Sequence, residues 1–290
     1  MSTPVILVVG SLHYDIMVEA DHLPRKDETA IGQRWYPKFG GKGGNQAVAV
    51  ARQGVGARML GAVDADDFGR FLRAGLQSKS VDAGFVRDVP GTGSGMSVAI
   101  QDADGDYAAT IVSGANLAIA PDWLDNPVLW QGVGLLILQN EVPEPINLAA
   151  ATAARAQGIR TVLNAAPFRP LSPSLQRLVD ILVVNAVEAE MMGAGDVSSL
   201  KDAVDAAGTL AQRFGAVIVT AGALGLAARS AEGAFDLPAR KITVVSSHGA
   251  GDCFIGAFAV ALVKGDSFRD ACATASEAAA RHVAGQPPGP

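Results

Sequence analysis

From Val133 onward, short apolar runs alternate with helical patterns. The apolar runs predict strands at Val133–Leu138, Arg160–Leu163, Ile181–Val184 and Val217–Thr220. Helical patterns lie between them, at Pro145–Gln157, Leu171–Val179 and Leu200–Phe214. Strands joined through helices pair in parallel, and the helices then cover both faces of the sheet. This half of the chain therefore predicts an α/β fold with a doubly wound, largely parallel sheet.

The N-terminal half predicts more of this sheet and a second, smaller one. Val5–Val9 is a continuous apolar run closed by Gly10, which is typical of a strand buried on both faces. A further strand is expected at Met59–Val63, followed by a helix at Asp67–Ser78. Pieces at about 13–18, 31–36 and 97–112, the last with a hairpin turn at 102–106, fit a small antiparallel sheet. We find no repeat and no interdomain linker, and we expect one domain over residues 1–290.

Composition limits the partners and the compartment. The 290 residues are 49% hydrophobic, which indicates a large buried core. A net charge of −6 without a long basic run argues against nucleic acid or an anionic membrane surface as partners. The two cysteines, Cys253 and Cys272, fall in apolar helical patterns and resemble buried thiols. No apolar segment approaches the ~20 residues that span a bilayer, and a strand at Val5 leaves no room for a signal peptide, so we expect a cytoplasmic protein.

A glycine turn near the C-terminus predicts an anion site. Gly249–Asp252 lies between a strand expected at Ile242–Val245 and a helix expected at Cys253–Val263, which Gly265 would end. Free N–H groups at a helix N-terminus bind anions. Asp252 would repel an anion, but it would be useful if it took a proton from a hydroxyl that attacks a bound phosphoryl group. The alternative is that Asp252 merely caps the helix, and both interpretations remain open.

A second glycine turn and several polar residues predict a crevice at one edge of the sheet. Gly40–Gly44 carries Lys42 and precedes a helix expected at Gln46–Gln53, closed by Gly54. Ligands of parallel sheets bind beyond the carboxyl ends of the strands. The residues that follow the strands are Asp15, Glu141, Asn164, Asn185, Glu188, Thr220, Gly222, Gly225 and Asp252. The Gly-x-Gly-x-x-Gly and P-loop patterns are absent from the sequence, which argues against dinucleotide dehydrogenases and P-loop enzymes.

Seven short motifs together carry a resemblance to a known family. Gly40–Ala47 (GGKGGNQA) and His248–Asp252 (HGAGD) resemble the two signatures of the ribokinase (PfkB carbohydrate kinase) family. The others recur in the family's order, at Gly10–Asp15, Ser113–Asn116, Leu138–Glu141, Asn164–Pro167 and Asn185–Glu188. The likeness covers nearly the whole chain and is closest to the ribokinase branch.

The resemblance implies a doubly wound α/β domain with a small β lid, a homodimer formed through the lid, and transfer of the γ-phosphoryl group of ATP, with Mg²⁺, to a sugar hydroxyl. Ribose is the leading candidate. By the resemblance, the catalytic group is the base Asp252 with an anion hole at Gly249, Ala250 and Gly251. The sugar site would comprise His13, Asp15, Gly41, Lys42, Gly43, Asn45, Glu141 and Asp252. The nucleotide site would comprise Asn185, Thr220, Gly222, Gly225 and Gly251, with Asn185 and Glu188 placing Mg²⁺ indirectly.

The chain departs from the family in ways that bear on specificity and on cations. His13 stands where ribokinases commonly carry Asn, and Leu224 replaces a residue that is often polar. Ser246 stands where an acidic residue helps to hold a monovalent cation, and the sequence stops soon after Gln286. Activation by K⁺ is therefore not expected. Gly249 and the hydroxyls at 246–247 would hold the turn instead.

Two alternatives to a sugar kinase remain. A nucleoside kinase of the same fold is possible because a lid and a pocket bearing His13 could hold a base. A catalytically silent sugar- or nucleotide-binding protein belongs to another class. Retention of Asp252 and Lys42 argues against the silent protein.

Overall fold

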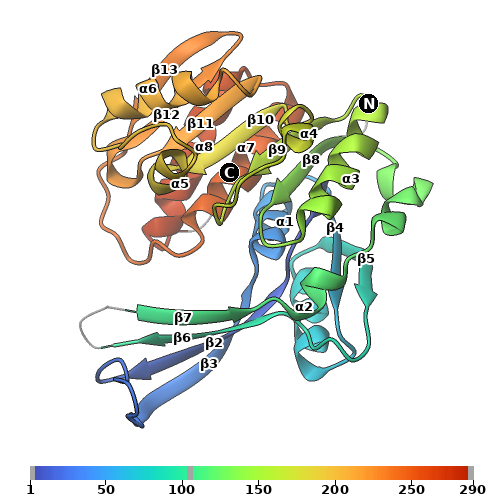
Figure 1. Cartoon of the computed structure of the whole chain (residues 1–290), viewed down its shortest axis with the longest axis vertical. Helices are drawn as coiled ribbons and strands as arrows, with labels where there is room; N and C mark the ends of the chain where they lie inside the picture. Colours follow the sequence, from blue (N-terminus) through green and yellow to red (C-terminus); the bar gives the residue numbers. More distant parts are fainter. Residues whose placement is uncertain (1–3, 103–106, 287–290) are drawn as a thin grey trace.

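The computed structural model describes residues 4–102 and 107–286, and its main body is a nine-stranded sheet (Figure 1). In spatial order the strands are β13 (Gly233–Pro238), β12 (Gly225–Ser230), β11 (Ala216–Thr220), β10 (Ile181–Asn185), β9 (Arg160–Asn164), β8 (Val133–Gln139), β1 (Val5–Val9), β4 (Ala57–Val63) and β5 (Val81–Asp88). Pairing is parallel from β11 to β5, and β12 and β13 add an antiparallel edge. The predicted α/β fold with a largely parallel sheet is confirmed.

Helices cover both faces of this sheet. They are α1 (Lys42–Arg52), α2 (Asp67–Ser78), α3 (Glu144–Ala156), α4 (Pro173–Gln176), α5 (Ala186–Met191), α6 (Leu200–Leu210), α7 (Ala250–Lys264) and α8 (Phe268–Val283). Short 3-10 turns are η1 (Gly114–Ala118), η2 (Pro121–Asp125), η3 (Pro127–Trp130) and η4 (Gly222–Leu224). Side chains alternate across β1, so that Ile6 and Val8 join one buried cluster and Leu7 and Val9 join the other. The continuous apolar run of β1 follows from this double burial.

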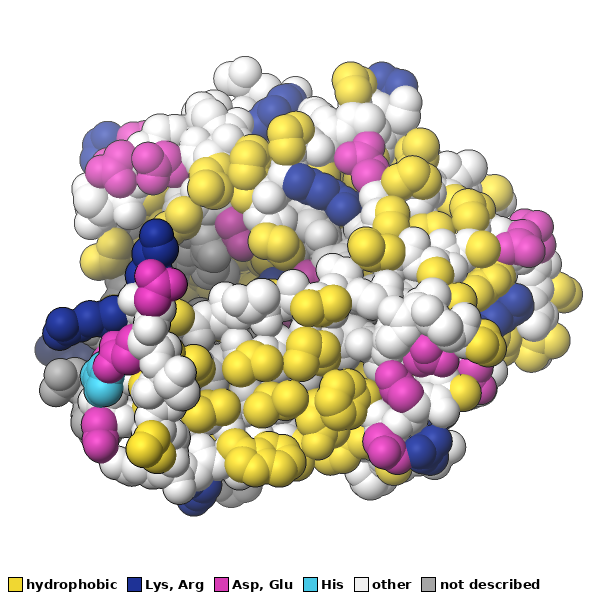
Figure 2. All heavy atoms as spheres, turned by 60° about the horizontal axis from the view of Figure 1, so that its bottom comes forward, with side chains coloured by type: hydrophobic (Ala, Val, Ile, Leu, Met, Phe, Trp, Pro, Cys, Tyr) yellow, Lys and Arg dark blue, Asp and Glu magenta, His cyan; other side chains and the backbone are white. Residues whose placement is uncertain are grey.

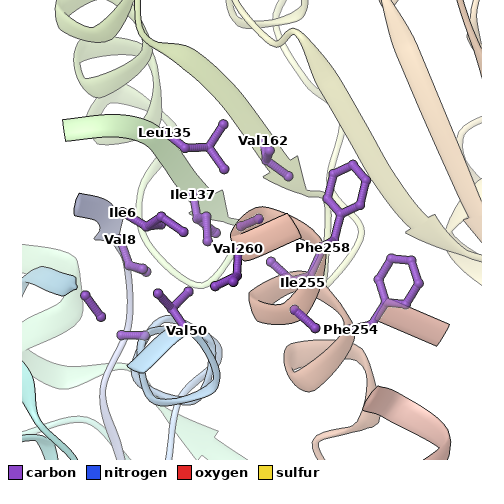
Figure 3. Close-up of a cluster of buried hydrophobic side chains, with 14 of the residues drawn as sticks. Ile6, Val8, Val50, Leu135, Ile137, Val162, Phe254, Ile255, Phe258 and Val260 are labelled. Atoms are coloured by element: carbon purple, nitrogen blue, oxygen red, sulfur yellow. The ribbon is translucent and has the colours of Figure 1, made fainter. Parts of the chain in front are cut away.

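The cluster under α1 and α7 positions the functional end of both helices. Figure 3 shows Ile6, Val8 and Ile137 from the sheet near Val50 of α1 and Val260 of α7, with the ring of Phe258 toward Val162. The two helices pack closely, since a Cβ at Gly256 would overlap the side chain of Ala49. A glycine is needed there because the backbone of α7 approaches α1 directly. The N-termini of both helices are thereby held side by side.

A separate four-stranded sheet, the lid, extends from the large sheet (Figure 1). Its order is β3 (Gly32–Gly40), β2 (His13–Ala20), β6 (Met96–Gln101) and β7 (Tyr107–Val112). The small sheet was predicted correctly, but its pairing was not, because β2 and β6 run parallel. The turn expected at 102–106 lies largely outside the described residues. Among those residues, no helix has both the length and the apolar character needed to cross a membrane.

Several local predictions were wrong. The strand expected at Ile242–Val245 is irregular backbone, with Val244 and Val245 64% and 72% exposed, and the unpredicted hairpin β12–β13 forms that edge of the sheet. Helix α1 begins at Lys42 rather than Gln46, because the glycines expected to form a turn lie in its first turn and let it approach the β1–β2 junction. The helix expected at Leu171–Val179 shrinks to α4. Strand β5 and helix α5 were not predicted either.

Candidate active site

Asp252 lies in the first turn of α7, at the carboxyl edge of the large sheet. Gly249 begins the helix in a left-handed conformation, with φ 76°, and no side chain caps this end. Asp252 therefore does not act as the cap, which removes one of the two interpretations of this residue. Its side chain is buried, with 8% of the residue exposed. Burial raises the pKa of Asp252 to about 6, against the opposing effects of the Lys42 charge and of hydrogen bonds from Gln46 and Asn45.

Two amides from α1 orient this carboxylate. The Gln46 Nε2 donates to Asp252 Oδ1 at 2.9 Å, and the Asn45 Nδ2 donates to Asp252 Oδ2 at 3.2 Å. Gln46 Oε1 in turn accepts from Gln139 Nε2 at 2.9 Å, and Gln46 Nε2 also donates to Asn164 Oδ1 at 3.1 Å. Because Gln139 occupies the oxygen of Gln46, the nitrogen of Gln46 must face the carboxylate. Sequence reasoning missed Gln46 and Gln139 as site residues.

Glu141 binds the N-terminus of α1. Its Oε2 accepts from the backbone N–H of Lys42 at 2.8 Å and from Ser11 Oγ at 2.5 Å. The Ser11 Oγ also accepts from the N–H of Gly43 at 3.3 Å. A Cβ at Gly43 would lie 2.7 Å from Ser11 N, so this glycine is required for the close contact. The structure therefore brings Glu141, Gly41, Lys42 and Gly43 together beside Asn45.

Asp15 and His13 enter from the first half of lid strand β2. Asp15 is 7% exposed, and its Oδ1 accepts from Ser97 Oγ at 2.5 Å. Burial raises the pKa of Asp15, while the Ser97 hydrogen bond and the nearby His13 lower it. A Cβ at Gly40 would overlap the Asp15 carboxylate, so glycine is required beside it. The Nε2 of His13 is buried and has no hydrogen-bond partner among the described residues, which leaves it available to a ligand.

The residues expected to bind nucleotide follow β10 and β11. Asn185 and Glu188 form a reciprocal capping box at the start of α5, with Glu188 N to Asn185 Oδ1 at 2.8 Å and Asn185 N to Glu188 Oε2 at 2.9 Å. Burial raises the pKa of Glu188. Thr220 is the direct neighbour of Asn185 across the sheet. Gly222 and Gly225 adopt positive φ values, 54° and 120°, in the turn that leads into β12.

A cavity of about 320 Å³ lies beside the N-terminal end of α7. At one end it reaches Asn45, Gly249 and Asp252, and it continues along α1 to Arg52 and Lys79. Metal ligands are sparse in the region, since the described ranges contain no group of three or more His, Cys, Asp or Glu side chains placed to hold an ion. The arrangement combines a buried carboxylate, two helix N-termini and hydrogen-bonding side chains suited to hydroxyl groups.

Comparison with known proteins identifies the family. A family model described as pfkB family carbohydrate kinase matches residues 4–286. The chain belongs to this family. It is 31% identical to the ribokinase of Bacillus subtilis over 279 residues, covering 96% of this chain and 92% of that protein. It is a carbohydrate kinase.

Two solved structures are also similar. The structure of Arabidopsis thaliana ribokinase complexed with ribose and ATP matches with a TM-score of 0.89 and 28% identity, covering 97% of this chain and 93% of that one. A Burkholderia thailandensis nucleoside kinase in complex with inosine matches with a TM-score of 0.78 and 23% identity, covering 96% and 89%. The second likeness shows a shared fold alone.

Proposed function

We propose that this carbohydrate kinase transfers the γ-phosphoryl group of ATP to a hydroxyl of ribose, with Asp252 as the general base. The observation that carries the proposal is the buried Asp252 carboxylate, oriented by Gln46 and Asn45 at the N-terminus of α7. The ribokinase from Bacillus subtilis and the ribose and ATP complex from Arabidopsis thaliana support ribose as the acceptor and ATP as the donor.

The chemistry follows from the position of the base. Asp252 accepts the proton of the sugar hydroxyl as the hydroxyl oxygen bonds to the γ-phosphorus of ATP. The bond from that phosphorus to the β–γ bridging oxygen breaks, and its electron pair leaves with ADP. With a pKa of about 6, Asp252 is ionised at neutral pH and is a stronger base than ordinary aspartate. In the proposed anion hole at Gly249, Ala250 and Gly251, the N–H groups of Gly249 and Gly251 stabilise the charge on the transferring group. The N–H of Ala250 donates to the carbonyl oxygen of Ser247 at 3.2 Å, so Ala250 contributes through the shape of the turn.

The sugar site draws on both sheets. Asp15 accepts hydrogen bonds from sugar hydroxyls, and the unpartnered His13 Nε2 supplies a further polar contact. Glu141 lines the pocket while it fixes the start of α1. The remaining contacts in the proposed site come from Gly41, Lys42, Gly43 and Asn45. We propose that the whole chain acts as one domain in which the lid covers this site.

The nucleotide site lies along β10 and β11, with Gly251 beneath the transferring phosphate. The proposed contacts are Asn185, Thr220, Gly222, Gly225 and Gly251. We propose an indirect role for Glu188 toward Mg²⁺. Its Oε2 already accepts the hydrogen bond of the capping box, and its carboxyl is largely buried. Direct ligands of Mg²⁺ would therefore come mainly from the ATP phosphates. Bound Mg²⁺ would neutralise charge between the β- and γ-phosphates.

A monovalent cation does not fit the loop before α7. Ser246 offers a hydroxyl in place of a carboxylate, and the carbonyl of His248 already accepts a hydrogen bond from His282 at 2.9 Å. We propose that turnover depends little on K⁺.

We propose that two copies associate through their lids. Trp35, Ile111 and Val112 are 63%, 55% and 53% exposed, and Figure 2 shows apolar side chains gathered over this part of the molecule. Exposed apolar groups of this extent favour a protein interface.

The two thiols, Cys253 and Cys272, are unpaired, which supports the expected cytoplasmic location.

The test is ADP release measured over a panel of ribose, 2-deoxyribose, other pentoses, hexoses and nucleosides. We expect the highest kcat/KM with ribose. Higher kcat/KM with a nucleoside would replace ribose with the alternative substrate class. Binding of sugar without ADP release would favour the silent protein instead.

A further inference from the structure

We infer that His282, near the end of α8, is a positioning residue that holds the phosphoryl-binding turn in the place of a monovalent cation. The inference rests on the proposed function, in which the turn at Gly249–Gly251 binds the transferring phosphoryl group. It concerns what keeps that turn in its active shape.

The segment that precedes the turn, residues 240–248, has few contacts with the rest of the protein. Residues 240–248 are exposed and form neither helix nor strand, although they lead directly into α7. The last turn of α8 holds the segment: Val245 N and Ser246 N both donate to the carbonyl oxygen of Val283, at 2.8 and 3.2 Å. His282 Nε2 adds a contact to the carbonyl oxygen of His248, at 2.9 Å. The end of α8 therefore anchors the segment just before the turn.

The His248 carbonyl controls the first N–H of the turn. The peptide bond between His248 and Gly249 is a rigid plane in which C=O and N–H point in opposite directions. A donor that holds the carbonyl therefore fixes the direction of the Gly249 N–H. The imidazole of His282 also lies directly beside Gly249, since a Cβ added at Gly249 would lie 3.3 Å from His282 Nε2. Gly249 has φ 76°, which glycine adopts without strain, and the backbone hydrogen bond across the turn, from Ala250 N to the carbonyl oxygen of Ser247, is long at 3.2 Å. A donor on the His248 carbonyl therefore adds a second restraint to the turn.

The surroundings favour a neutral donor over a cation. The cavity beside His282 is lined by the cationic side chains Lys38, Arg52, Lys79 and Arg281. Asp252 is the one carboxylate among the described lining residues. A K⁺ ion would be repelled by these charges, whereas the N–H at His282 Nε2 holds the His248 carbonyl through a hydrogen bond.

The chain offers a matched control on the same helix. Arg240 and Glu277 form a two-bond ion pair, at 3.1 and 3.0 Å, which ties the start of the segment to α8. This pair is exposed and contacts neither His248 nor His282 through a hydrogen bond among the described residues. Glu277→Gln therefore weakens attachment of the segment without touching the His248 carbonyl, whereas His282→Leu removes the donor to that carbonyl.

The experiment compares kcat and KM for three variants with ribose and ATP. We expect His282→Leu to lower kcat by about 10- to 100-fold, because misplacing a group that contacts the transition state by about 1 Å has effects of this size, with little change in the ribose KM. His282→Gln keeps an N–H donor and should retain most of the activity. Glu277→Gln should match the wild type.

A fourth variant separates the hydrogen bond from general folding. His282→Ala leaves room for free imidazole, which should restore kcat in a saturable way if a donor to the carbonyl is what matters. The inference is wrong if His282→Leu keeps the wild-type kcat, or if the kcat of His282→Gln is as low as that of His282→Leu. It is also wrong if Glu277→Gln lowers kcat as much as His282→Leu does, or if imidazole does not raise the kcat of His282→Ala. A wild-type enzyme inactive on every acceptor would instead refute the proposed function itself.

Discussion

Replacing Gln46 with Met should move the pH dependence of catalysis. Met has a similar size but cannot donate to Asp252 Oδ1, which now accepts from Gln46 Nε2 at 2.9 Å. A hydrogen bond to a charged group contributes about 1.5–3 kcal/mol, and about 1.4 kcal/mol corresponds to one pKa unit. The bond stabilises the ionised carboxylate, so its loss should raise the pKa of Asp252 by about 1–2 units above the present value of about 6.

The assay is kcat/KM for ribose between about pH 5 and 9 at saturating Mg²⁺ and ATP. The acid limb should rise with ionisation of Asp252, at about pH 6 in the wild type and about pH 7–8 in Gln46→Met. Titration of ATP itself is common to both enzymes and cancels in the comparison. Gln139→Met is the graded control. Among the described residues Gln139 donates to Gln46 and forms no hydrogen bond with Asp252, so the shift of the acid limb should be smaller. An acid limb that stays in place in Gln46→Met would refute this account of Asp252.

Four further predictions follow from the site. Asp252→Asn should lower turnover by about 10²–10⁴-fold, because the proton acceptor is lost. It should also raise the melting temperature above pH 6: burial raises the pKa of Asp252 from 3.8 to about 6, so ionising this carboxyl costs up to about 3 kcal/mol of folding stability above pH 6 and nothing below pH 4. A lower melting temperature would contradict this account. Glu188→Gln should raise the Mg²⁺ concentration needed for activity more than the ribose KM, and an unchanged Mg²⁺ requirement counts against its role. Trp35→Glu should dissociate the proposed lid-to-lid dimer in sedimentation, and a variant that sediments as the wild type does would refute the lid interface. Turnover should change little when K⁺ is titrated into a tetramethylammonium buffer at constant ionic strength. A saturable, several-fold rise in turnover would show that the loop binds K⁺ after all.

The sequence predicts most of the large sheet because its strands are buried on both faces and its helices are separated by glycine and polar turns. The error at Ile242–Val245 has a clear cause. β-branched residues favour strands, but a strand needs a paired neighbour, and the hairpin β12–β13 already forms that edge of the sheet. Pairing of β2 with β6 in parallel was missed for a related reason, since period-2 patterns identify strands and not their partners.

The family resemblance implied that Asp252 and Lys42 belong to one sugar site. In the structure the charge of Lys42 lowers the pKa of Asp252, against the effect of burial. The amides that orient the base were not found. Gln46 and Gln139 lie 93 positions apart and belong to different elements, so nothing local pairs them. The available signal was that each is a polar residue at the end of an apolar run, and both are fully buried in the structure, which requires hydrogen-bond partners.

The close contact between Ala49 and Gly256 has a consequence for how the site is built. It joins α1 and α7 into one rigid block that carries Asn45, Gln46 and Asp252, while Asp15 belongs to the lid. Because Asn45 and Asp252 also belong to the proposed sugar site, this block carries the proposed transfer chemistry together with part of the sugar contacts, and the lid adds Asp15 and His13. Variation in the lid can diversify the acceptors of such an enzyme, whereas a single methyl group added at residue 256 would disturb the chemistry common to all of them.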